Sequence, residues 1–143
     1  RERLVFSSRL PLPDHLARHR LADLFLDTLP YNAHTTASDA LWAGLPVLTR
    51  TGTTFPGRVG TSLLTAVGLP ELVTRDEPQY EALAVALATD RRRLAAIRDK
   101  LAHNRLSQPL FDTGQFTRDL ESAYRTMVDR CFAGLAPAHF SVG

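Results

Sequence analysis

Imidazole, hydroxyl and carboxylate side chains gather in one short segment of this chain, His34-Thr35-Thr36-Ala37-Ser38-Asp39. The residues up to Gly44 favour a short helix, so the small polar residues stand at its N-terminus. The first turn of a helix presents backbone N–H groups without intrahelical partners and a partial positive charge, which together bind phosphate oxygens. Asp39 lies one turn in, within reach of a ribose. The segment therefore predicts a site for a nucleotide.

A simpler interpretation of these residues stays open. Thr35 or Thr36 can cap a helix, and Asp39 can favour the positive end of the helix dipole without any ligand. The flanking residues favour the nucleotide, because the apolar run at 24–28 predicts a strand that leads into the loop at 30–33. Ligands of open α/β sheets bind outside the carboxyl ends of strands, which is where this loop falls.

The chain alternates between short apolar runs and helical patterns up to about residue 75. The expected strands are 4–7, 24–28, 47–49 and 72–74, and the expected helices between them are 14–22, 36–43 and 55–67. This alternation predicts an α/β fold with a parallel sheet and crossover helices. After Pro78 the pattern is helical only, with Asp90 capping a second helix and a terminal amphipathic helix at 115–133, whose apolar face we expect to be partly exposed.

The segment that contains the polar cluster resembles a known family. Residues 21–49, LADLFLDTLPYNAHTTASDALWAGLPVLT, are similar to the C-terminal catalytic lobe of the O-linked N-acetylglucosaminyltransferases, in a bacterial-type form. Three later segments resemble the family's next loop and helix, its next strand and its closing segment, in the same order: 52–62, 68–73 and 107–124. The resemblance covers nearly the whole chain and implies the C-terminal half of a GT-B Rossmann-like lobe, followed by C-terminal helices.

We expect three parts on this basis. Residues 1–75 would be the nucleotide-binding part of the lobe, incomplete on its N-terminal side, since the strand expected at 4–7 has no partner before it. Residues 76–134 would be helices that pack on the lobe, and 135–143 a flexible tail. We therefore expect the chain to be a piece of a longer protein, with an open sheet edge that allows self-association.

The resemblance implies an inverting, metal-independent transferase that moves N-acetylglucosamine from UDP-N-acetylglucosamine to serine or threonine hydroxyls of proteins. His34, Thr35 and Thr36 would lie at the diphosphate, Asp39 at the ribose and His15 beside the uracil. This chain would supply the UDP-binding region, and upstream regions would hold the protein acceptor. Two alternatives stay open: a related UDP-glucose-dependent protein transferase, and a noncatalytic module that binds UDP or self-associates.

Two positions depart from the family's pattern. Leu12 stands where a lysine often precedes the uracil-side histidine. The lysine that clamps the diphosphate has no counterpart, since the only lysine, Lys100, lies in a helix far along the chain. We name no catalytic residue in this chain and expect the chain alone to be inactive.

The segment from Gly52 to Gly57 is a second candidate. It carries the hydroxyls of Thr53 and Thr54 and precedes Arg58, so it can close over the sugar or the diphosphate. A plain connector with a surface arginine is the alternative.

Metal-binding patterns are weak in this sequence. It contains no Asp-x-Asp pair of the kind that holds a divalent cation at a diphosphate, and Asp23 and Asp27 predict a cap and a loop anchor. His15 and His19 share a helical face, but no third ligand has usable spacing. We expect no metal and no cofactor apart from the donor substrate.

Composition excludes several other classes. A length of 143 residues indicates about one domain, and a hydrophobic content of 44% can form a core. The net charge of +2 without aromatic interleaving predicts no nucleic-acid partner. No secretory or membrane segment is visible and the single cysteine excludes an internal disulfide, so we expect a cytoplasmic protein without membrane partners.

Overall fold

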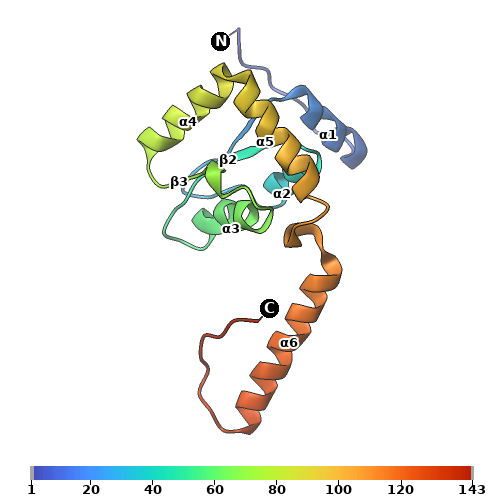
Figure 1. Cartoon of the computed structure of the whole chain (residues 1–143), viewed down its shortest axis with the longest axis vertical. Coiled ribbons are helices and arrows are strands. Elements are labelled where there is room, and N and C mark those ends of the chain that lie inside the picture. The colour runs from blue at the N-terminus through green and yellow to red at the C-terminus, as the bar shows by residue number, and fades with distance from the viewer. Residues whose placement is uncertain (1, 143) are drawn as a thin grey trace.

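Three short parallel strands lie among the helices of the upper body in Figure 1, above the long C-terminal helix. The computed structural model describes residues 2–142, so Arg1 and Gly143, the ends of the first and last predicted parts, lie outside it. The strands are β1 (Phe25–Leu26), β2 (Val47–Arg50) and β3 (Val73–Thr74), in the order β1-β2-β3. Phe25 pairs with Val47, and Thr49 with Val73. Because all pairs are parallel, the carboxyl ends of the three strands lie at the same edge.

Helices connect the strands and follow them. The elements in chain order are α1 (Leu12–Arg18), the 3-10 turn η1 (His19–Leu21), β1, α2 (Thr35–Trp42), β2, η2 (Pro56–Arg58), α3 (Val59–Ala66), η3 (Pro70–Leu72), β3, α4 (Glu77–Thr89), α5 (Arg91–Asn104), η4 (Pro109–Phe111) and α6 (Thr113–Phe132). The predicted α/β fold with a parallel sheet and crossover helices, followed by C-terminal helices, is confirmed.

The strand predicted at 4–7 is wrong. Residues 4–7 form no strand, and Val5 and Phe6 are 90% and 93% exposed. An apolar run becomes a strand only where a neighbouring strand takes up its backbone hydrogen bonds, and among residues 2–142 no strand pairs with this one. The helix predicted at 14–22 begins earlier, at Leu12, and ends at Arg18 before the 3-10 turn.

Local signals set several helix ends. The Asp90 carboxylate accepts a hydrogen bond from Arg93 N at 3.0 Å, so the predicted cap of the second C-terminal helix is confirmed. Gly44 has φ +87° and ends α2, where Leu45 N donates to Ala40 O at 2.8 Å. That backbone conformation favours glycine, which explains why the helix stops here.

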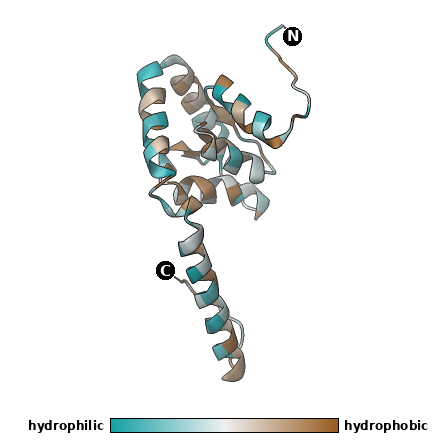
Figure 2. Ribbon diagram, turned by 90° about the vertical axis from the view of Figure 1, so that its right-hand side faces the viewer, coloured by the Kyte–Doolittle hydropathy of each residue, from teal (hydrophilic) through white to brown (hydrophobic). Residues whose placement is uncertain are grey.

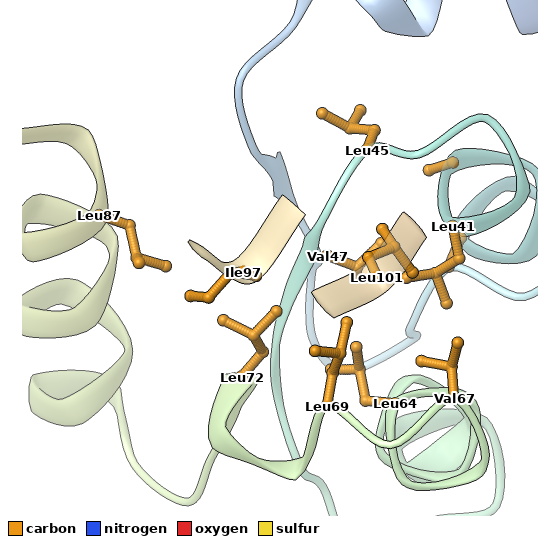
Figure 3. Close-up of a cluster of buried hydrophobic side chains, with 12 residues drawn as sticks. Leu41, Leu45, Val47, Leu64, Val67, Leu69, Leu72, Leu87, Ile97 and Leu101 are labelled. Atoms are coloured by element: carbon orange, nitrogen blue, oxygen red, sulfur yellow. The ribbon is translucent and has the colours of Figure 1, made fainter. Parts of the chain in front are cut away.

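One hydrophobic core joins the sheet to α2, α3, α4 and α5 (Figure 3). Val47 and Leu48 are both fully buried, and since successive strand residues point to opposite faces, β2 is covered on both sides. The buried cluster consists of Ala37, Ala40, Leu41, Leu45, Val47, Leu64, Val67, Leu69, Leu72, Leu87, Ile97 and Leu101. The core therefore fixes β2 and the start of α2 relative to each other.

The terminal helix α6 extends away from this body (Figures 1 and 2). It contributes no buried residue, and Phe116, Tyr124 and Met127 on its apolar face are exposed, as predicted for this face. Within residues 2–142, no helix is long and apolar enough to cross a membrane.

Candidate functional site

The loop after β1 delivers His34 to the start of α2. The helix begins at Thr35, and His34 is its N-cap residue. The first intrahelical bond runs from Ser38 N to His34 O at 3.0 Å, so the preceding N–H groups have no acceptor within the helix. In the part of the chain that the structure describes, no side chain caps them, which contradicts the alternative that Thr35 or Thr36 serves as a cap. The N-terminus of α2 is therefore open to an external acceptor.

The ring of His34 is held between two aromatic side chains. It stacks on Tyr31 with ring centroids 4.8 Å apart and planes at 16°, and Phe55 lies edge-on at 6.3 Å. Its Nε2 atom is buried and has no hydrogen-bond partner among residues 2–142. The stacking fixes the ring plane while leaving one ring nitrogen for a ligand.

A cavity of about 420 Å³ opens at the carboxyl end of β1. Its lining includes His34 and Thr36 of the predicted site, together with Tyr31 and Asp27. Asp39 lies in the middle of α2, half-buried, and within residues 2–142 no side chain pairs with its carboxylate. The structure thus brings His34 and Thr36 into one cavity and places Asp39 one turn along the same helix.

His15 belongs to a different element. It lies on α1, where its ring is edge-on to His19 at 4.8 Å and its carbonyl oxygen is 2.9 Å from His19 Nδ1. No contact found in residues 2–142 joins His15 to His34. The same part of the chain contains no group of three or more His, Cys, Asp or Glu side chains arranged to hold a metal ion.

The segment from Gly52 to Gly57 folds back on itself. Gly52 N donates to Gly57 O at 2.6 Å, Thr54 Oγ1 accepts from Gly57 N at 3.3 Å, and Arg58 Nη1 donates to Thr53 O at 3.2 Å. Thr53 and Thr54 line a second cavity of about 470 Å³, whereas Arg58 holds its own loop. Because Phe55 belongs to this loop and contacts His34, the two candidate segments are neighbours.

Asp27 is a loop anchor, as predicted, and its role is larger than the sequence indicated. Its Oδ1 accepts from Thr28 N at 2.8 Å and Ala33 N at 2.7 Å, and its Oδ2 accepts from Thr49 Oγ1 at 2.6 Å. Asp23, predicted as a cap, instead forms an ion pair with Arg98 at 3.3 Å.

Two further polar residues of this site were missed by sequence reasoning. Asn32 is buried, donates to Thr28 O at 2.9 Å and accepts from Gly60 N at 3.3 Å. Its only signal was an asparagine in a loop, which is typical of turns. Tyr80 of α4 donates its hydroxyl to Asp27 O at 2.8 Å. Burial and, secondarily, the Asp27 carboxylate raise the pKa of Tyr80 above 10.0.

The fold and this site define a Rossmann-like α/β unit with an open helix N-terminus at the carboxyl edge of its sheet. The sequence matches glycosyl transferase family 41 over residues 1–120, and the chain belongs to this family. The resemblance found in the sequence is confirmed.

Particular relatives are similar over most of this chain. The UDP-N-acetylglucosamine--peptide N-acetylglucosaminyltransferase of Caenorhabditis elegans is 40% identical over 139 residues, or 97% of this chain and 12% of that protein. A probable enzyme of the same name, SPINDLY of Hordeum vulgare, is 42% identical over 87% of this chain and 13% of that protein. The structure of the Thermobaculum terrenum O-GlcNAc transferase mutant K341M matches with a TM-score of 0.87 and 42% identity, over 93% of this chain and 26% of that one. The chain thus spans a small part of the relatives that it matches.

Proposed function

We propose that this chain is the UDP-binding region of an inverting, metal-independent glycosyltransferase that transfers N-acetylglucosamine from UDP-N-acetylglucosamine to serine or threonine hydroxyls of proteins. The names of the relatives support the donor and the peptide acceptor. The observation that carries the proposal is the pairing of the uncapped N-terminus of α2 with the unpartnered Nε2 of His34, both at the carboxyl edge of the sheet.

Loss of UDP from the sugar requires stabilisation of negative charge on the departing diphosphate. Preorganised N–H groups supply this stabilisation in a cleft from which water is excluded. The N–H groups of Thr35 and Thr36 would bind diphosphate oxygens, and the exposed hydroxyls of both threonines add donors. His34 Nε2 would complete the set, and Asp39 would accept hydrogen bonds from the ribose.

The acids of this site support a mechanism without a metal ion. Asp27 lines the cavity, but both of its oxygens are engaged by donors from the protein. Asp39 has a carboxylate that no side chain of residues 2–142 pairs with, but it is a single acid one turn along α2, which we assign to the ribose. A divalent cation at a diphosphate requires carboxylate oxygens that are free to coordinate it. Charge stabilisation would therefore come from the helix terminus and His34. Lys100, which pairs with Glu71 at 2.7 Å, is engaged elsewhere.

Calorimetric titration of UDP tests the proposal. UDP is titrated into the 143-residue chain and into the longest natural polypeptide that contains it, each with Asp39→Ala and the control Asp99→Ala, which removes an exposed carboxylate of α5. We expect Asp39→Ala to weaken binding by about 1.5 to 3 kcal/mol, as for a charge-assisted hydrogen bond, or roughly 10- to 150-fold in Kd. Asp99→Ala is expected to bind as the unmodified chain does. Equal affinities of all three proteins would remove Asp39 from the site, and absence of binding by both polypeptides would refute the proposal.

A further inference from the structure

We propose that Asp27 is a positioning residue for His34, with Thr49 and Gly60 holding its carboxylate in place. The inference rests on the proposed function, since it concerns how the histidine at the diphosphate is oriented. Asp27 itself would not contact the nucleotide through its carboxylate, because its oxygens are already bound within the protein.

The Asp27 carboxylate connects the two ends of the loop that precedes His34. Oδ1 accepts from the backbone N–H of Thr28, where the chain leaves β1, and from that of Ala33, at 2.8 and 2.7 Å. The Ala33 peptide lies directly before His34. A shift of this carboxylate would therefore move the backbone from which the His34 ring projects.

Strand β2 and helix α3 hold the Asp27 carboxylate in place. Thr49 is fully buried in β2 and donates its hydroxyl to Asp27 Oδ2 at 2.6 Å. Gly60 of α3 covers the same oxygen, since a Cβ at position 60 would lie 2.6 Å from both Asp27 Oδ2 and Thr49 Oγ1. Asp27 is only 5% exposed, and its carboxylate is thus enclosed on the side of Thr49 and Gly60.

Asn32 joins this arrangement to the loop that carries Phe55. Its side-chain oxygen accepts from Gly60 N at 3.3 Å, and its backbone N–H donates to Pro56 O at 3.1 Å. Tyr31 and Phe55, the two rings that contact His34, consequently lie on segments tied to the same group of buried polar atoms. Supporting hydrogen bonds of this kind determine how well a binding side chain is preorganised.

A matched pair of threonine variants separates positioning from general stability. Thr49→Val removes the hydroxyl that binds Asp27 and keeps the side-chain volume. Thr74→Val removes a buried hydroxyl of β3 that donates to Thr49 O at 2.9 Å, a bond within the sheet. Thr49→Ser retains the hydroxyl, and Asp27→Asn changes the acceptor itself. Far-UV circular dichroism establishes that each variant is folded.

Two measurements are made on the folded variants: the UDP dissociation constant, and the imidazole signals of His34 in heteronuclear NMR spectra without ligand. We expect Thr49→Val and Asp27→Asn to raise Kd by about tenfold, the lower end of the effect of outer-shell partners of metal-binding histidines. Both should also shift or broaden the His34 signals. Thr74→Val should change Kd by less than about twofold, because the Thr74 hydroxyl binds the backbone oxygen of Thr49 and not the Asp27 carboxylate. Thr49→Ser, which retains the hydroxyl, should leave both the UDP dissociation constant and the His34 signals as they are in the unmodified protein.

The NMR measurement decides the inference independently of the nucleotide. If Thr49→Val and Asp27→Asn change the His34 signals no more than the control Thr74→Val does, Asp27 does not position His34 and the inference is overturned. If the signals change but His34→Ala binds UDP as tightly as the unmodified protein, the proposed diphosphate role of His34 fails while the positioning contact stands. Should Asp27→Asn not fold, Thr49→Val and Thr49→Ser still give the comparison.

Discussion

Replacement of Gly60 by alanine tests how tightly the polar atoms beneath the site are packed. Gly60 is the second residue of α3, and its backbone N–H faces Asn32 while its Cα faces Asp27 and Thr49. An added methyl group would stand 2.6 Å from an oxygen of each of the latter two residues. Neither oxygen can retreat easily, because each is buried and bound to the other at 2.6 Å.

The expected cost of Gly60→Ala follows from these contacts. Overpacking of a filled interior costs about 1 to 3 kcal/mol. Separation of Thr49 from the Asp27 carboxylate costs a further 1.5 to 3 kcal/mol, roughly, as for a hydrogen bond to a charged group. The better helix propensity of alanine offsets about 1 kcal/mol. We therefore expect the free energy of unfolding to fall by about 1.5 to 5 kcal/mol.

Urea unfolding followed by circular dichroism measures this loss, and the chain offers a matched control. Gly114 is also the second residue of its helix, α6, but a Cβ there would lie 3.4 Å from Asp112 Oδ1 and 3.5 Å from Arg118 Nη1, both ordinary contacts. Gly114→Ala is expected to leave the midpoint unchanged or raise it. A Gly60→Ala midpoint equal to that of the unmodified chain would refute the argument that the site is closely packed.

Three further substitutions, one of them a control, test the Tyr80 contact and the hydrophobic core. Because the pKa of Tyr80 is raised above 10.0 in the folded chain, the unfolded chain loses this proton first as the pH rises. The protonated Tyr80 hydroxyl therefore contributes fully to the free energy of unfolding below about pH 10, and this contribution is lost as the pH rises through the folded-state pKa. Tyr80→Phe should reduce this alkaline loss in urea titrations, and an equal loss in both proteins would contradict the assignment. Leu101→Ala, at a fully buried position, is expected to lower the free energy of unfolding by about 2 to 5 kcal/mol. Leu106→Ala, at a side chain that is 77% exposed, should stay within about 0.5 kcal/mol, and similar midpoints for the two leucine variants would be evidence against the core described above.

Elements with local signals were predictable from the sequence. The helix expected at 36–43 is α2 at Thr35–Trp42, because Gly44 takes a left-handed conformation that ends it. The helix after Asp90 begins where its cap predicts. By contrast, the strand expected at 24–28 is only Phe25–Leu26, since the chain turns at Asp27 into the loop that its carboxylate holds.

The supporting contacts of the site could not be predicted in this way. Asp27 and Thr49 are separated by 22 positions, and Asp27 and Tyr80 by 53. No periodicity or spacing in the sequence connects such pairs, because the parallel register and the packing of α4 bring them together. Likewise, residues 34–39 alone allowed both the cap and the ligand interpretation of Thr35 and Thr36. The flanking residues favoured the ligand, but only the structure shows that His34, and not a threonine, is the N-cap residue.

The distribution of hydrogen bonds divides the polar residues of this site into two groups. Asp27 and Asn32 are buried and bound to donors and acceptors of the protein, as buried polar groups must be if they are not to destabilise the fold. His34 Nε2 and the N-terminal amides of α2 have no such partners in the described chain, although an unpaired buried nitrogen is costly. A ligand with acceptor oxygens would remove that cost on binding. The same principle thus explains why the first group holds the loop, and it is the reason for which we propose the second group as the part of the site that binds a diphosphate.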